Sequence, residues 1–178
     1  VQHRAIDLGL THFDTAALYG FGANASLLGE ALASCRNRVH LATKCGMTGI
    51  DGRRVIDGRP ETLKRTCLES LTRLRTDVID LWYLHRWDKR VPIEESVGAM
   101  ADMVASGHVR AIGLSEVSAA TLRRASAVHP VSAVQNEYSL WSRNPELGLL
   151  EACHELGTTL VAFAPLARGF LADAIDDP

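Results

Sequence analysis

The sequence predicts an α/β fold in which helices cover a parallel sheet, and two features of the chain lead to this prediction. Short apolar segments recur along the 178 residues without regular polar alternation, which is typical of strands buried on both faces. Between them lie segments whose apolar residues repeat at helical spacing. Strands of this kind, alternating with amphipathic helices, form parallel sheets with helices packed on their faces.

Six segments have the length and apolar character of buried strands. In chain order they are HFDTA from His12, VHLATK from Val39, VIDLWYLH from Val78, VRAIGLS from Val109, SAVQNEY from Ser132 and TTLVAFAPL from Thr158. Their spacing corresponds to six strand-helix units of roughly thirty residues each.

Five segments have the pattern of amphipathic helices. They run from about Ala25 to Cys35, from Pro60 through Leu63, Cys67, Leu71 and Leu74, from Pro92 through Ile93, Val97, Met100 and Val104, from Ser118 to before Pro130, and from Asn144 to Gly157. Proline is favoured in a first helical turn, and Ser118 and Asn144 are residue types that cap helix N-termini. Gly107 and Gly157 stand where a left-handed residue would end a helix.

Polar or special residues at the strand ends favour a closed barrel over an open sheet. The six predicted strands end in Asp14, Lys44, His85, Ser115, Gln135 and the turn from Phe163 to Arg168. In a (β/α)8 barrel all such ends meet at one mouth, whereas an open sheet gathers its ligand beside a few strands. Six contributing ends therefore predict a barrel.

The predicted barrel is incomplete. A full (β/α)8 barrel takes about 250 residues, and this chain opens with what reads as the end of a helix running into the strand at His12. We expect one domain, residues 1–178, that lacks the first strand and the last part of the barrel. Unpaired strand edges in such a chain would be an aggregation hazard.

Composition excludes several classes of partner. The 19 basic and 21 acidic residues give a net charge of -2, which leaves no field of one sign to bind nucleic acid or an anionic membrane. No apolar run approaches the roughly 18 to 20 residues of a membrane span, and the N-terminus lacks a secretory pattern, so we expect a cytoplasmic protein. The cysteines Cys35, Cys45, Cys67 and Cys153 form no C-x-x-C pair, which argues against zinc and against a disulfide framework. No metal site is predicted elsewhere.

Asp14, Tyr19, Lys44 and His85 form the candidate catalytic group. If the first three predicted strands are neighbours, Asp14, Lys44 and His85 lie within one side-chain length, and Tyr19 lies over them from the following loop. Reduction of a carbonyl by hydride requires a proton donor, a nearby cation that makes this donor more acidic and a second donor that orients the oxygen. Each residue alone is more often structural, so the prediction rests on the combination.

Six motifs occur in an order that resembles the aldo-keto reductases. They are HFDTAALYGFG, LATKCG, DVIDLWYLHRWD, VRAIGLSEVS, AVQNEYSLWSR and AFAPLARGFL, and the similarity runs from Val1 to about Leu171. The resemblance implies a TIM barrel that binds NADPH without a separate Rossmann domain and reduces a small-molecule aldehyde or ketone. It also implies that Tyr19 is the general acid, that Lys44 and Asp14 tune it, and that His85 orients the carbonyl.

The same resemblance implies the cofactor-binding positions. Ser115 and Gln135 match residues that hydrogen-bond the nicotinamide carboxamide, Phe163 matches an aromatic stacked on the nicotinamide ring, and Leu166, Arg168 and Gly169 match a turn near the pyrophosphate. Two positions depart from the pattern. Glu116 stands where many relatives have asparagine, and an ionised carboxylate only accepts hydrogen bonds. Ala167 replaces a frequent glycine of the phosphate turn.

Two other functions remain open from the sequence. The first is a regulatory subunit that keeps the fold and binds the cofactor without turnover. The second is a Schiff-base aldolase with Lys44 as nucleophile, which requires a neutral lysine. A neighbouring Asp14 would keep Lys44 charged, which disfavours the aldolase.

Overall fold

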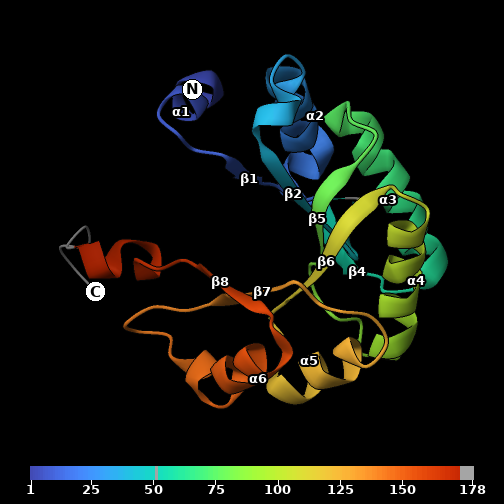
Figure 1. Ribbon diagram of the computed structural model, residues 1–178, viewed down its shortest axis with the longest axis vertical. Coiled ribbons are helices and arrows are strands. Elements are labelled where there is room, and N and C mark those ends of the chain that lie inside the picture. The colour runs from blue at the N-terminus through green and yellow to red at the C-terminus, as the bar shows by residue number, and fades with distance from the viewer. Residues whose placement is uncertain (51, 173–178) are drawn as a thin grey trace.

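Parallel strands and helices alternate in the computed structural model, which describes residues 1–50 and 52–172 (Figure 1). One sheet contains β1 (His12–Asp14), β2 (His40–Cys45), β5 (Ile79–Leu84), β6 (Val109–Ser115), β7 (Ala133–Glu137) and β8 (Thr159–Phe163). These six strands are parallel neighbours in the order β1-β2-β5-β6-β7-β8. The sheet curls so that β1 and β8, its edge strands, face each other across the open side (Figure 1). The predicted α/β fold with part of a (β/α)8 barrel is confirmed.

The helices lie on the convex side of the curled sheet (Figure 1). They are α2 (Ala23–Leu32), α3 (Pro60–Leu74), α4 (Ile93–Ala105), α5 (Ala119–Ser126) and α6 (Leu149–Leu156), and a short α1 (Gln2–Asp7) precedes β1. Right-handed crossovers between parallel strands place helices on the outside of such a sheet. Every predicted strand and helix is present within a few residues of its expected bounds, except at the start of α6.

At three helix ends the local sequence was sufficient to predict the residue that ends or caps the helix. The Ser118 Oγ accepts a hydrogen bond from the Thr121 N–H at 3.2 Å, and Gly107 and Gly157 have φ of +79° and +65°. These three predictions are confirmed. The prediction that Asn144 caps a helix running to Gly157 is wrong, because Asn144–Glu146 forms only a 3₁₀ turn and Gly148, with φ of +94°, separates it from α6.

Side chains alternate between two packed faces of the sheet, as the period of a strand requires. The outer face carries large residues such as Leu41, Trp82 and Ile112, which pack against the helices. The inner face is built from smaller residues such as Ala42 and Ala133, together with the buried ring of Tyr83. A Cβ at Gly113 would overlap that ring, so this glycine allows Tyr83 to fill the inside of the curl.

A two-stranded hairpin after β2 was not predicted. Its strands are β3 (Met47–Ile50) and β4 (Arg53–Ile56), which pair antiparallel apart from the main sheet. Both are only four residues long, and their apolar residues are separated by threonine, glycine and arginine, so the segment lacked the continuous apolar run that identified the other strands. The hairpin lies beyond the C-terminal end of β2, on the same side as the candidate site.

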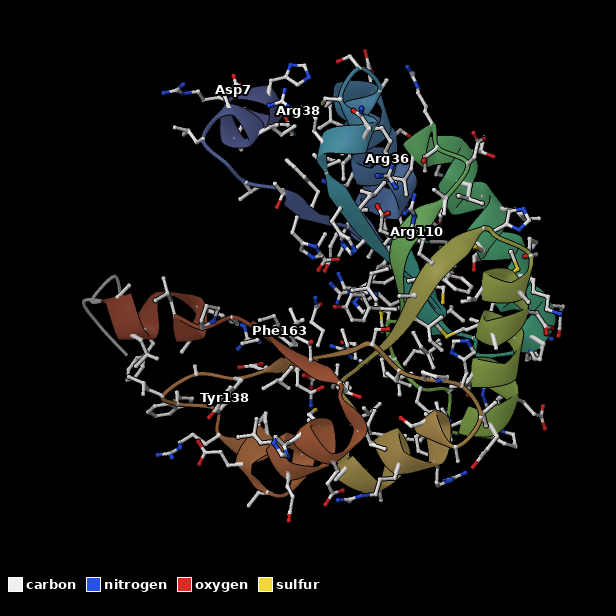
Figure 2. All side chains as sticks on the ribbon, viewed as in Figure 1. Asp7, Arg36, Arg38, Arg110, Tyr138 and Phe163 are labelled. Atoms are coloured by element: carbon white, nitrogen blue, oxygen red, sulfur yellow. The ribbon has the colours of Figure 1, made fainter. Side chains whose placement is uncertain are left out.

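The opposite end of the strands is stabilised by one buried carboxylate. Asp80 on β5 accepts hydrogen bonds from the Leu41 N–H at 2.8 Å and from Arg36 at 2.6 Å, and it forms an ion pair with Arg110 at 3.1 Å. Figure 2 shows Arg36 and Arg110 coming together at this end of the sheet. Breaking such a group leaves buried charge and backbone polar atoms unpaired, so Asp80 is a stability element rather than a site residue.

The four cysteines are free and buried, which agrees with their interpretation as packed thiols. Burial raises the pKa of Cys67 to about 12 and raises that of Cys45 well above its usual value, so both thiols are neutral. No helix in the described part of the chain has the length and apolarity needed to span a bilayer.

Candidate active site

The candidate site lies at the C-terminal ends of the strands because the inner face of each strand changes there from small to functional residues. Lys44 comes two residues after Ala42 on β2, and Gln135 comes two residues after Ala133 on β7. The same step of two leads from Tyr83 to His85. Since residues two apart on a strand share a face, these side chains project toward the inside of the curl.

A buried ion pair forms the base of the site. The Lys44 Nζ lies 2.7 Å from each carboxylate oxygen of Asp14, and it also donates to the Thr15 carbonyl at 3.0 Å. The Lys44 side chain is 1% exposed and that of Asp14 is 27% exposed. A cation this deeply buried needs a counter-charge beside it, and Asp14 supplies that charge.

Tyr19 lies over this pair. It begins the turn that follows β1 (Tyr19–Gly22), and the Lys44 Nζ is 5.2 Å from the centroid of its ring. The ring of His85 meets it edge to face, with 5.9 Å between centroids. The structure therefore brings Asp14, Tyr19, Lys44 and His85 together from three neighbouring strands.

His85 is a neutral imidazole. Burial, followed by the nearby charges of Lys44 and Arg86, lowers its pKa from 6.5 to about 4. Its Nδ1 is buried and has no hydrogen-bond partner among the described residues. A neutral imidazole can donate a hydrogen bond from one ring nitrogen, which suits a group that binds a carbonyl oxygen.

Asp14, Tyr19 and His85 border a cavity of about 310 Å³, and Lys44 lies buried behind Asp14 outside its lining. Its walls are formed by His12, Asp14, Tyr19, His85, Arg86, Ser115, Gln135, Val161, Ala162 and Phe163. The lining combines the rings of Tyr19 and Phe163 with several polar side chains that point into one space, which suits a small polar organic molecule. The five residues expected to act on substrate or nicotinamide thus share one cavity: Tyr19, His85, Ser115, Gln135 and Phe163.

Ser115 and Gln135 are neighbours across the β6–β7 pair. The Ser115 Oγ accepts a hydrogen bond from Arg86 at 3.1 Å, so its own proton remains available to donate. The Gln135 Nε2 donates to Asp14 at 2.8 Å, which connects β7 to β1 across the inside of the curl. A carboxamide has one C=O acceptor and one NH₂ donor group, so a hydroxyl donor next to an amide can hydrogen-bond both ends of it.

The turn η4 (Ala167–Ala172) lies beyond β8 and outside the cavity lining. Arg168 and Gly169 have positive φ there, 58° and 101°, and Leu166 precedes them as an exposed side chain. Arg168 pairs with Glu137 at 3.1 Å and is itself 73% exposed. The structure brings Phe163 to the cavity, where Figure 2 marks it on β8, but it does not bring these three turn residues there.

Glu116, which departs from the family pattern, has a structural partner. Its Oε1 accepts from the Glu137 backbone N–H at 2.7 Å, and its own φ is +55°. The carboxylate therefore connects the end of β6 to the end of β7 by a hydrogen bond, and it does not line the cavity.

Two features of the site were not found by sequence reasoning. The hydrogen bond from Gln135 to Asp14 joins residues 121 positions apart, and only the curvature of the sheet brings them together. His12 lines the cavity, and its position two residues before Asp14 on the same face of β1 was the available signal. Within residues 1–50 and 52–172, no cluster of histidine, cysteine and carboxylate side chains is suited to a metal ion.

The chain belongs to the aldo-keto reductases: the profile of the Aldo/keto reductase family matches residues 1–178. Among curated proteins it is similar to a probable aldo-keto reductase of Glycine max, with 46% identity over 169 residues. That alignment covers 93% of this chain and 49% of the relative, so the chain spans about half the length of this relative.

Solved structures show the same architecture. The glycerol dehydrogenase from Gluconobacter oxydans superposes with a TM-score of 0.93 at 32% identity, over 99% of this chain and 56% of that one. An aldo-keto reductase from Klebsiella pneumoniae, solved in complex with NADPH, has a TM-score of 0.80 at 31% identity, over 98% of this chain and 58% of that one.

Proposed function

We propose that the protein reduces the carbonyl group of an aldehyde or ketone with hydride from NADPH, and that Tyr19 donates the proton. The observation that supports this most directly is that a phenol and a neutral imidazole border one cavity, with a buried ammonium close behind the phenol. The Lys44 ammonium lies 5.2 Å from the Tyr19 ring, and the His85 ring lies 5.9 Å from it. Membership in the aldo-keto reductase family supports the same conclusion.

In the proposed reaction Tyr19 supplies a proton as the carbonyl carbon gains a hydride. The carbon forms a C–H bond, the C=O bond becomes C–O–H, and the phenolate left on Tyr19 regains a proton from solvent. The Lys44 ammonium stabilises that phenolate, and Asp14 holds the ammonium in place with two contacts of 2.7 Å. His85 donates a hydrogen bond that orients the carbonyl oxygen.

The residues present fit a nicotinamide cofactor. NADPH, when bound, supplies the hydride. The free proton of the Ser115 hydroxyl and the amide of Gln135 would hold the carboxamide, and the Phe163 ring would pack against the nicotinamide. We assign Leu166, Arg168 and Gly169 to the pyrophosphate turn, since the guanidinium of Arg168 is exposed on a tight turn with left-handed backbone at Arg168 and Gly169. The NADPH complex of the Klebsiella pneumoniae relative agrees with this choice of cofactor.

The test is made on the protein expressed with all the sequence that its gene encodes. We expect it to consume NADPH, measured by absorbance, when an aromatic aldehyde is added. Tyr19→Phe should lower kcat by about 10² to 10⁴-fold, the usual contribution of a general acid, while NADPH still quenches protein fluorescence. Tyr138→Phe is the matched control, because Tyr138 is outside the cavity and hydrogen-bonds Glu146.

Three outcomes would redirect the assignment. Turnover that survives Tyr19→Phe removes the proton-donor role. Quenching by NADPH without turnover on a broad panel of aldehydes indicates a regulatory subunit. Borohydride trapping of substrate on Lys44 indicates an aldolase, a result that the contacts between Lys44 and Asp14 oppose.

A further inference from the structure

The loop that carries Tyr19 has a backbone conformation that it does not favour by itself. Gly20, Phe21 and Gly22 all have positive φ, at 56°, 52° and 98°. Glycine adopts this region freely, but Phe21 has a Cβ that makes the left-handed conformation unfavourable. A strained, partly exposed loop of this kind keeps one shape only when surrounding contacts hold it.

Besides the hydrogen bonds within the loop, one contact that holds it comes from the β3–β4 hairpin. The Phe21 ring lies directly on the backbone of Gly49 in β3, so closely that a Cβ at Gly49 would overlap the ring atoms Cδ1 and Cε1. On the other side, Gly22 approaches the guanidinium of Arg73, where an added Cβ would be 3.0 Å from Cζ. A cavity of about 280 Å³ lies between the loop, the hairpin and α3, so the loop is not packed continuously on that helix.

The hairpin is itself fixed to the loop that follows His85. Arg90 donates to the Ile56 carbonyl at 3.0 Å, and the Gly58 N–H donates to Asp88 at 3.3 Å. The buried Ser96 hydroxyl donates to the Gly58 carbonyl at 2.7 Å. The hairpin is therefore in contact with two loops at once, the one that carries Tyr19 and the one that begins at His85.

We propose that Phe21 and Gly49 are positioning residues for Tyr19, and that the β3–β4 hairpin sets the position of the Tyr19 hydroxyl relative to His85. This inference rests on the proposed function, in which both side chains meet the carbonyl oxygen. Phe21 does not line the cavity bordered by Asp14, Tyr19 and His85, so it acts through the loop rather than on the substrate. Only glycine at position 49 leaves room for the ring.

The experiment compares Gly49→Ala with the unmodified protein, both expressed at full gene-encoded length. The new methyl group displaces Phe21, and a shift of about 1 Å at a reacting group costs on the order of 100-fold in rate. We expect kcat to fall by about that factor, with KM for the aldehyde and the dissociation constant of NADPH changed less than about threefold. Gly98→Ala is the matched control, since nothing lies within 4 Å of an added Cβ there.

A second pair of variants separates positioning from general damage. In a Phe21→Ala background, where the ring is absent, Gly49→Ala should add less than about a twofold loss, because the two effects share one contact. Phe21→Tyr keeps the ring and should retain activity. Hydrogen exchange of the Gly20, Phe21 and Gly22 amides should quicken in Gly49→Ala while the unfolding midpoint changes little.

The results distinguish this inference from the proposed function. Unchanged kcat in Gly49→Ala, with turnover lost in Tyr19→Phe, overturns the inference alone. Turnover that survives Tyr19→Phe overturns the proposed function. Unchanged amide exchange in the loop of Gly49→Ala overturns the positioning role whatever the chemistry proves to be.

Discussion

Replacement of Asp14 by asparagine is expected to destabilise the fold because it leaves the Lys44 ammonium buried without a counter-charge. The two charges are 2.7 Å apart, which corresponds to about 6 kcal/mol at an effective dielectric constant near 20. The Thr15 carbonyl still accepts from Lys44 at 3.0 Å, and the partly exposed Asp14 position admits water. The net loss of folding free energy in Asp14→Asn should therefore be about 3 kcal/mol.

A second effect acts in the same direction. Asp14 accepts from both Lys44 and Gln135, whereas asparagine presents one acceptor and one donor. One of these two neighbours must then face an N–H group. The loss should exceed that from neutralising an exposed pair, which is usually below about 1 kcal/mol.

Urea unfolding measures the loss. With a slope of about 1 to 3 kcal/mol per molar, a loss of about 3 kcal/mol should lower the midpoint of Asp14→Asn by about 1 to 3 M. Lys44→Met should restore part of the stability when it is added to Asp14→Asn, because it removes the uncompensated charge. A loss under about 1 kcal/mol, or no recovery in the double variant, would refute the account of a buried ion pair.

Three further results are expected, each read as a change in unfolding free energy. Since the pKa of His85 is lowered from 6.5 to about 4, the unfolded chain binds a proton in that window that the folded chain does not. The free energy of unfolding should therefore fall by about 3 kcal/mol as pH drops from 6.5 to 4. In His85→Gln the urea midpoint should decline less over the same pH range. Asp80→Ala should lower the free energy of unfolding by about 2 to 4 kcal/mol, measured by denaturant titration, because it leaves buried donors unpaired. The control Asp102→Ala removes an exposed ion pair with Lys64 and should cost under about 1 kcal/mol. Equal losses in the two variants would contradict this. Gly113→Ala should cost about 1 to 3 kcal/mol because its methyl group overlaps the Tyr83 ring, and a thermal midpoint equal to that of the unmodified protein would count against the tight packing.

The sheet was predictable because its central strands are largely buried on both faces, and because the apolar runs of the strands stand out from the helical segments. Large apolar residues such as Trp82 and Ile112 pack against the helices, and they are visible in the local sequence as apolar runs. The gathering of Asp14, Lys44 and His85 followed from one rule, that parallel strand ends meet at one edge. The roles of these residues and of the cofactor-binding positions stay predictions.

The remaining features depend on contacts that no local pattern contains. The β3–β4 hairpin is held by residues far along the chain, such as Arg90, rather than by an apolar run of its own. The start of α6 was missed because Gly148 interrupts a segment whose capping residues suggested an earlier beginning. The hydrogen bond of Gln135 needs the whole curvature of the sheet before its partner is in reach.

The hydrogen bond between Gln135 and Asp14 limits how the cavity can change during evolution. Asp14 and Gln135 come from strands that are separated by three others in the sheet, so their contact spans the arc and helps to set its radius. The same carboxylate balances the ammonium of Lys44. Asp14 therefore links the charge at the bottom of the cavity to the width of its mouth. A variant selected for a wider opening at this position would also alter the electrostatics of the site. New substrate preferences in this scaffold should therefore arise through the surrounding loops before they arise through position 14.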